Sequence, residues 1–166
     1  RIRARAVSAL AGDFRMTVYP GGAPLIRDAA HAGIVEGVLG MCGPGWHATV
    51  ESPVPGPGRR STDIRLDRPG DIVLLEVETR IGALEAIIRE CAEKRAAVAE
   101  GSPNAMEPRI HVVLVLPPTR HHRALANTHP GIVAAAFPAG HDALVHALTH
   151  ADVPWPGDGI LWMSGQ

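Results

Sequence analysis

Three carboxylates at the ends of neighbouring predicted strands are the residues best placed to do chemistry. Glu76 and Glu78 lie two apart at the end of an apolar run that begins at Ile72, so their side chains share one strand face. Asp63 lies on the preceding predicted strand and comes beside Glu76 if the two strands pair as a hairpin. Carboxylate oxygens are ligands that Mg²⁺ prefers, and a further carboxylate can orient or deprotonate an attacking water. The pattern therefore predicts a site for Mg²⁺, or for Mn²⁺ in its place, held by Asp63 and Glu76.

The same acidic residues have a plainer interpretation. They could line a solvated strand end and pair with Arg65 or Arg80, which are close in sequence. Without a cation, carboxylates this close would raise one another's pKa, so either a metal or a basic side chain is expected beside them. On spacing alone the ion-paired strand end is favoured, because acidic pairs in such positions are common.

The elements that must position these residues follow from the hydrophobic pattern. The run from Ile72 to Leu75 is typical of a strand covered on both faces, and the turn Arg68-Pro-Gly70 joins it to the strand before it as a hairpin. A strand, a helix and a second strand then imply a right-handed crossover and a parallel pair. We expect a single α/β domain with a mixed central sheet flanked by helices. The predicted helices are 4–10, 24–39, 82–99, 120–137 with a break at Pro130, and 141–151; the predicted strands are 14–19, 46–54, 61–66, one starting at 71, 110–116 and 160–163.

Length, charge and cysteine content narrow the classes of protein to which this chain could belong. The length of 166 residues suits one domain, and the apolar runs are too short to span a bilayer. The formal net charge of −1 argues against strong nonspecific binding of nucleic acid, but it is compatible with a local basic patch. Cys42 and Cys91 lack metal-like spacing, and no signal peptide is recognised at the start. A cytoplasmic protein with reduced thiols is expected.

The acidic motif resembles the core of the PD-(D/E)xK restriction-endonuclease-like superfamily. Asp63, a gap of about a dozen residues, and Glu76-Val77-Glu78 in an apolar strand followed by a helix match that core. The resemblance implies a restriction-endonuclease-like fold, Mg²⁺ bound by Asp63 and Glu76, and Glu78 at the position of the catalytic base. Glu36, on the predicted helix 24–39, matches an accessory acidic position.

Further segments are similar to a group of actinobacterial (XRE-like) regulators, in which a DNA-binding helix-turn-helix precedes a nuclease-like domain. The resemblance implies a DNA-binding transcriptional regulator, with DNA as partner and with no membrane association. Residues 1–22 would be an N-terminal helix and strand leading from an upstream helix-turn-helix, and residues 23–166 would be the nuclease-like domain. The protein could also form a homodimer. The similar segments are Val18-Tyr-Pro-Gly-Gly, Pro24 to His31, Glu51-Ser-Pro-Val-Pro, Glu76-Val-Glu-Thr79, Lys94-Arg95 and Ala134-Ala-Ala-Phe-Pro138.

One position departs from the superfamily pattern. Glu78 stands where the acid-x-Lys motif has its lysine, whose positive charge lies beside the scissile phosphate. Lys94, far along the following helix, is expected to be too distant to replace it, whereas Arg80 is adjacent in sequence. The domain is therefore either a metal-dependent nuclease or an inactive nuclease-fold module for DNA binding, ligand binding or dimerisation. A small-molecule or sugar-phosphate enzyme using the same carboxylates is a third alternative.

Basic residues and histidines around these elements have two interpretations each. Five arginines near the hairpin could hold phosphates or could balance the acidic residues; they are Arg59, Arg60, Arg65, Arg68 and Arg80. His146 and His150 have a spacing that zinc sites use, but no further ligand completes a set, so a solvated helix face is expected. His121 and His122 follow a predicted central strand and could touch a phosphate.

Overall fold

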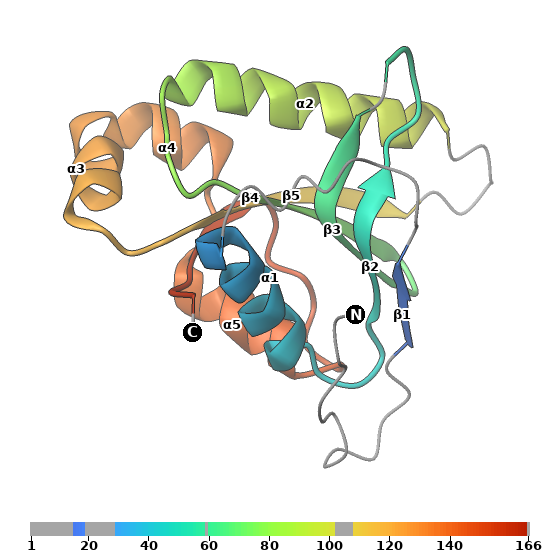
Figure 1. The fold of residues 1–166 in the computed structure, drawn as a ribbon. Helices are drawn as coiled ribbons and strands as arrows, with labels where there is room; N and C mark the ends of the chain where they lie inside the picture. Colours follow the sequence, from blue (N-terminus) through green and yellow to red (C-terminus); the bar gives the residue numbers. More distant parts are fainter. Residues whose placement is uncertain (1–14, 19–28, 59, 102–107, 166) are drawn as a thin grey trace.

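In the part of the chain that the structure describes, the centre is a mixed sheet of six strands whose order across the sheet follows their order along the chain. The computed structural model describes residues 15–18, 29–58, 60–101 and 108–165 (Figure 1). The strands are β1 (Arg15–Val18), β2 (His47–Pro53), β3 (Ser61–Arg68), β4 (Asp71–Val77), β5 (Arg109–Leu116) and β6 (Gly159–Trp162). The helices are α1 (Ala29–Met41), α2 (Leu84–Glu100), α3 (Arg120–Thr128), α4 (Pro130–Ala136) and α5 (His141–Thr149).

The middle of the sheet is an antiparallel meander flanked by parallel strands. β2, β3 and β4 pair antiparallel, while β1 runs parallel to β2 and β5 and β6 continue parallel to β4. The hairpin between β3 and β4 closes at the pair Arg68 and Asp71, as the Pro-Gly turn predicted. Gly70 has a φ of +84°, which residues with a Cβ rarely adopt. The predicted crossover through α2 and the parallel pair β4–β5 are confirmed.

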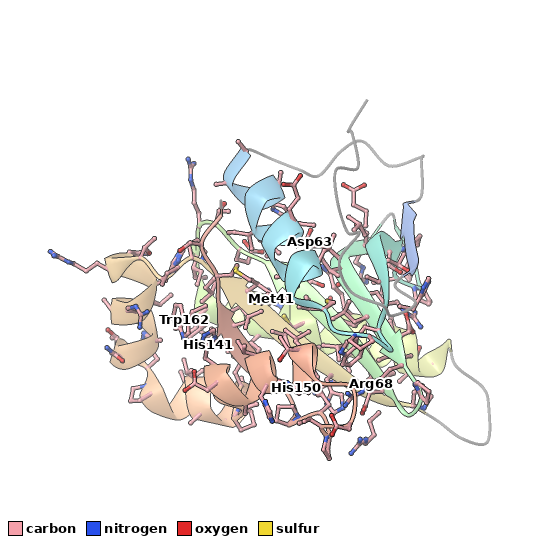
Figure 2. All side chains as sticks on the ribbon, turned by 90° about the horizontal axis from the view of Figure 1, so that it is seen from below. Met41, Asp63, Arg68, His141, His150 and Trp162 are labelled. Atoms are coloured by element: carbon pink, nitrogen blue, oxygen red, sulfur yellow. The ribbon has the colours of Figure 1, made fainter. Side chains whose placement is uncertain are left out.

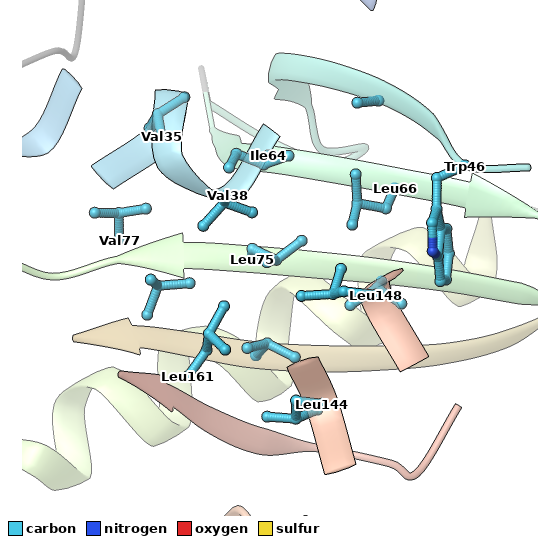
Figure 3. Packing of buried hydrophobic residues seen from close by; sticks show 14 of the residues in the cluster. Val35, Val38, Trp46, Ile64, Leu66, Leu75, Val77, Leu144, Leu148 and Leu161 are labelled. Carbon is cyan, nitrogen blue, oxygen red and sulfur yellow. The ribbon is translucent and has the colours of Figure 1, made fainter. Parts of the chain in front are cut away.

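Helices cover both faces of the sheet. α2 lies across one face, and α1 and α5 lie on the other, which Figure 2 views from below. Strand alternation sends Leu66 and Leu75 to the α1–α5 face, where they pack with Val38 and Leu148 (Figure 3). The opposite parity sends Leu74 toward α2. Every residue of β4 is buried, as its apolar run predicted.

The predicted single α/β domain with a mixed sheet flanked by helices is confirmed, with shifts of a few residues at the ends of elements. The break at Pro130 separates α3 from α4, because proline lacks the N–H that a continuous helix needs. The predicted helix 4–10 and the start of the helix expected at Pro24 lie outside the described residues. Among the described helices, none has the length and apolar character that crossing a membrane requires.

Candidate functional site

Glu76 forms a buried ion pair with a lysine from the helix above it. Its Oε2 accepts a hydrogen bond of 2.7 Å from the Nζ of Lys94, and the two side chains are 10% and 7% exposed. Glu90, one turn earlier on α2, approaches the same ammonium at 3.0 Å. The expectation that Lys94 lies too far away is therefore wrong. α2 crosses back over the sheet after β4, so a residue in the middle of the helix comes above the end of the strand (Figure 1).

The environment of this pair controls its protonation. Burial raises the pKa of Glu76 to about 7; Lys94 pulls the pKa down, and the charge of Asp63 pushes it up. Burial alone would lower the pKa of Lys94, but Glu76 and Glu90 hold it above its ordinary value. Glu76 Oε1 is buried and makes no short hydrogen bond among the described residues, although the hydroxyl of Thr62 lies near enough to the carboxylate to lower its pKa. One oxygen of a buried carboxylate is thus left to meet a further cation or donor.

Asp63 ends the pairing between β3 and β4. The ladder between these strands stops at Ile64 opposite Leu75, and the next backbone N–H, that of Val77, donates instead to Asp63 Oδ2 at 2.7 Å. The other carboxylate oxygen lies 3.5 Å from Nε2 of His31, which is buried on α1. Figure 2 shows Asp63 beside this helix. The carboxylate therefore takes the place of a backbone acceptor at a point where the strands separate.

The two predicted metal ligands are neighbours, but their partners come from opposite layers. The charge of Asp63 contributes to the raised pKa of Glu76, so the two carboxylates interact. However, Asp63 contacts His31 on α1, whereas Glu76 contacts Lys94 on α2. The simple picture of two side chains projecting in parallel from one strand face is therefore corrected: the end of the ladder at Ile64 lets Asp63 turn toward α1.

The other predicted acidic residues lie at the edge of this arrangement. Glu36 is exposed on α1, and His31 is the residue of that helix found beside Asp63. Glu78 is half-buried just beyond β4, where its backbone N–H donates to Val115 O at 3.0 Å. Glu78 thus lies just past the end of the strand that carries Glu76.

Three of the five predicted phosphate-binding arginines form ion pairs with acidic residues. Arg60 contacts Glu93 of α2 at 2.9 Å, Arg65 contacts Asp67 of its own strand at 2.7 Å, and Arg68 contacts Asp71 at 3.0 Å. Arg80 is exposed shortly after β4. Arg59 lies outside the described residues. The described ion pairs of Arg60 and Arg65 are therefore with acidic residues other than Glu76 and Glu78.

The predicted magnesium site can be tested against the donors present. No group of three or more His, Cys, Asp or Glu side chains within the described ranges could hold a metal ion. Mg²⁺ needs fewer protein ligands than that, because it keeps several of its waters and is commonly held by one or two carboxylates. Asp63 and Glu76 supply two carboxylates of the kind that Mg²⁺ takes, although their ion-pair partners lie on opposite sides of the sheet.

The histidines divide into structural and exposed residues. His122 is 3% exposed, and its Nδ1 lies 2.9 Å from Pro117 O, so its ring is held within the fold. His121 beside it is exposed. His146 and His150 are exposed on one side of α5 with ring centroids 4.4 Å apart, in line with a solvated face.

Sequence reasoning missed Lys94 and His31 as members of the site, although each leaves a signal. Lys94 is the only lysine in the chain and falls three residues after Cys91 and four before Val98, within the buried stripe of α2. His31 falls four before Val35 in the buried stripe of α1. A charged or titratable side chain at such a position has to find a polar partner inside the fold.

Two cavities lie elsewhere on the molecule. One, of about 410 Å³, lies between α2, β5 and the segment after α4, where Arg95 pairs with Asp158. The other, of about 360 Å³, adjoins Arg68 and Asp71 at the turn between β3 and β4. Neither cavity is lined by Asp63, Glu76 or Lys94.

Comparison with known proteins does not assign the chain to a family. No family model, no curated protein and no solved structure matches the chain. Its function has to be argued from the residues themselves.

Proposed function

We propose that this chain is the nuclease-like domain of a DNA-binding regulator, in which Asp63 and Glu76 bind Mg²⁺ for phosphodiester hydrolysis. The observation that carries the proposal is the 2.7 Å contact between Lys94 and Glu76. The acid-x-Lys motif lacks its lysine because Glu78 occupies that position. A lysine brought in from α2 supplies the missing positive charge beside the acidic residue.

The order of the elements supports a restriction-endonuclease-like core. A first helix, α1, precedes a hairpin that carries Asp63, the next strand ends in Glu76, and α2 follows. This is the succession that the resemblance to the PD-(D/E)xK superfamily implies. The parallel pairing of β4 with β5 after α2 extends it.

Each side chain then has a distinct role. Asp63 and Glu76 would hold the metal, which would supply polarisation of the phosphate and activation of water. Lys94 places a fixed positive charge where negative charge develops. Glu78 occupies the position of the base that orients or deprotonates the attacking water. Exposed Arg80 provides a contact for the DNA backbone. The accessory role of Glu36 rests on the resemblance alone.

A second function is favoured by a different property of the same residues. Lys94 already neutralises Glu76, and the Val77 N–H already donates a hydrogen bond to Asp63. The fold therefore meets most of the charge and hydrogen-bonding needs of both carboxylates without a metal. An inactive nuclease-fold module for DNA binding, ligand binding or dimerisation would need its acidic residues to be paired within the protein in this way.

The first test is a thermal-melt titration with Mg²⁺ and with Mn²⁺. We compare the wild type with Glu76→Gln, and use Glu93→Gln, a half-exposed acid on the same α2, as the matched control. A metal site predicts a rise in Tm that saturates, persists in the control and vanishes in Glu76→Gln. No shift at millimolar metal in the wild type would exclude the metal site.

The second test separates the two functions. Supercoiled, linear and single-stranded DNA are incubated with the protein and Mg²⁺, and both binding and cleavage are followed. If the protein is a nuclease, the wild type should cleave at least one form of DNA. Asp63→Asn and Lys94→Met should lose this cleavage but keep DNA binding. Binding without cleavage of any form favours the inactive module.

A further inference from the structure

A second charged cluster lies at the opposite end of β4 from Glu76. Asp71, the first residue of β4, is 3% exposed, and three basic side chains converge on its carboxylate. The Nε of Arg68 lies 3.0 Å away, an Nη of Arg109 lies 2.9 Å away, and Nε2 of His111 lies 3.2 Å away. Two permanently charged guanidinium groups face one carboxylate, so this cluster has a surplus of positive charge even with His111 neutral.

Two buried donors in this cluster lack acceptors. The guanidinium of Arg68 lies over the ring of Trp46, with its carbon 4.4 Å from the ring centroid. Arg68 Nη1 and Trp46 Nε1 are buried and have no hydrogen-bond partner in the part of the chain that the structure describes. A buried N–H without an acceptor is costly and uncommon in native proteins. Of the two, only Arg68 lines the cavity described next, so its Nη1 indicates a missing acceptor there, and next to surplus positive charge that acceptor is best an anion.

A cavity adjoins the same arginine. Its volume is about 360 Å³, which falls in the range of pockets for small molecules. Arg68 and Asp71 form its polar side, and small or apolar residues form the rest: Gly45, Pro69, Ala151 and Val153. Such a lining suits a compact ligand with one charged end and a short apolar body.

The geometry points to a binding site for a small organic anion, a carboxylate or a phosphate ester, whose charged group meets Arg68 in this cavity. Arg68 Nη1 is closed to solvent, so binding requires a small shift of the guanidinium toward the cavity while its Nε stays bonded to Asp71. The side chain of Arg109, which is 62% exposed, attracts the anion from solution.

A small molecule suits this position better than a DNA backbone does. The side chain of Arg68 is only 9% exposed, and a phosphate on a rigid duplex reaches exposed side chains rather than recessed ones. In Figure 2, Arg68 lies well away from Asp63. The site is thus separate from the acid–lysine pair, and it does not depend on the proposed nuclease function.

Binding is tested by calorimetric titration of the whole chain with butyrate and, separately, with inorganic phosphate. Ionic strength is held constant with chloride. We expect saturable binding of at least one probe, and a loss of affinity of about tenfold or more in Arg68→Met, as for one charge-assisted hydrogen bond. Arg89→Met, which removes an exposed arginine on α2, should bind as the wild type does.

A second variant guards against loss of folding, since Arg68 also supports Asp71. Ala151→Leu narrows the cavity from an exposed turn and leaves every charge in place, so it should weaken binding while Tm is maintained. Binding of butyrate alone identifies a carboxylate ligand, and binding of phosphate alone identifies a phosphoryl ligand. Absence of binding by both probes overturns the proposal. It is also overturned by equal binding in Ala151→Leu, or by duplex DNA binding that needs Arg68 in place of small-anion binding.

Discussion

Lys94 Nζ lies 2.7 Å from Glu76 Oε2, and this contact joins the middle of α2 to the end of β4. Both side chains are almost fully buried, at 7% and 10% exposed. Removing two charges from water costs about as much as their attraction returns, so such a pair is weak evidence for stability alone. We propose instead that the pair, whose glutamate interacts with the charge of Asp63, serves the metal-dependent chemistry described under the proposed function.

Removing one member of the pair should cost more than removing both. Lys94→Met leaves the Glu76 carboxyl buried without its cation, and we expect the free energy of unfolding to fall by about 3 kcal/mol. The double variant Glu76→Leu, Lys94→Met replaces the pair with apolar groups and should recover most of that loss. Urea denaturation of both single variants and the double variant measures the coupling. Additive effects of the two substitutions would show that the side chains do not interact in solution.

The stability of the fold should depend on pH through Glu76, with an unusual sign. Burial raises its folded pKa from 4.5 to about 7, so the folded state binds this proton more tightly than the unfolded state. The contribution of Glu76 to the free energy of unfolding is therefore fully present below about pH 4.5 and is lost as the pH rises to about 7. The loss is at most about 3 kcal/mol. Lys94 stays charged throughout, because its pKa is raised.

The control for this pH dependence is Glu76→Gln, which cannot ionise. Other carboxylates titrate in the same range, so the informative quantity is the free energy of unfolding of the wild type minus that of the variant. Denaturation in urea at a series of pH values should give a difference that declines between pH 4.5 and 7. A difference that rises over this window would mean that Lys94 holds the pKa of Glu76 below its ordinary value.

Much of the fold could be predicted from local pattern. The apolar run Ile72–Leu75 predicted a buried strand, and Pro69-Gly70 predicted the hairpin turn, because both signals depend on residues adjacent in sequence. Pro130 likewise predicted the break between α3 and α4. The α/β class followed from the order of these elements.

The partners inside the site could not be predicted in the same way. The contact of Lys94 with Glu76 depends on the angle at which α2 crosses the sheet, which no local pattern specifies. The bond from the Val77 N–H to Asp63 depends on where the β3–β4 ladder stops. Strand alternation assumes that the ladder continues, so it placed Asp63 and Glu76 side by side on one face.

Two glycines three residues apart should respond to alanine in opposite ways. Gly40 lies in α1, and a Cβ added to it would meet no heavy atom of the described residues within 4 Å, so Gly40→Ala should stabilise the protein by about 0.5–1 kcal/mol through helix propensity. Gly43 follows the helix, and its Cβ would lie 2.4 Å from Thr149 O at the end of α5. Gly43→Ala should therefore lower Tm, since it pushes apart the contact in which Gly43 N–H donates to Leu148 O at 2.8 Å. Thermal melts of both variants decide this, and a neutral Gly43→Ala would mean that the loop does not pack on α5.

The structural and metal-binding roles of Asp63 can be separated with two substitutions. Asp63→Ala leaves the Val77 N–H without its acceptor, and we expect the free energy of unfolding to fall by about 1–3 kcal/mol. Asp63→Asn keeps an oxygen at that position, so most of this loss should be avoided, while the negative charge that a divalent metal needs is gone. Denaturation in the presence of EDTA measures the first effect, and the Mg²⁺-dependent rise in Tm measures the second. The expected pattern is a stable Asp63→Asn that no longer responds to Mg²⁺. An Asp63→Asn that still shows the full metal response would exclude Asp63 as a ligand and leave it the purely structural task of ending the β3–β4 ladder.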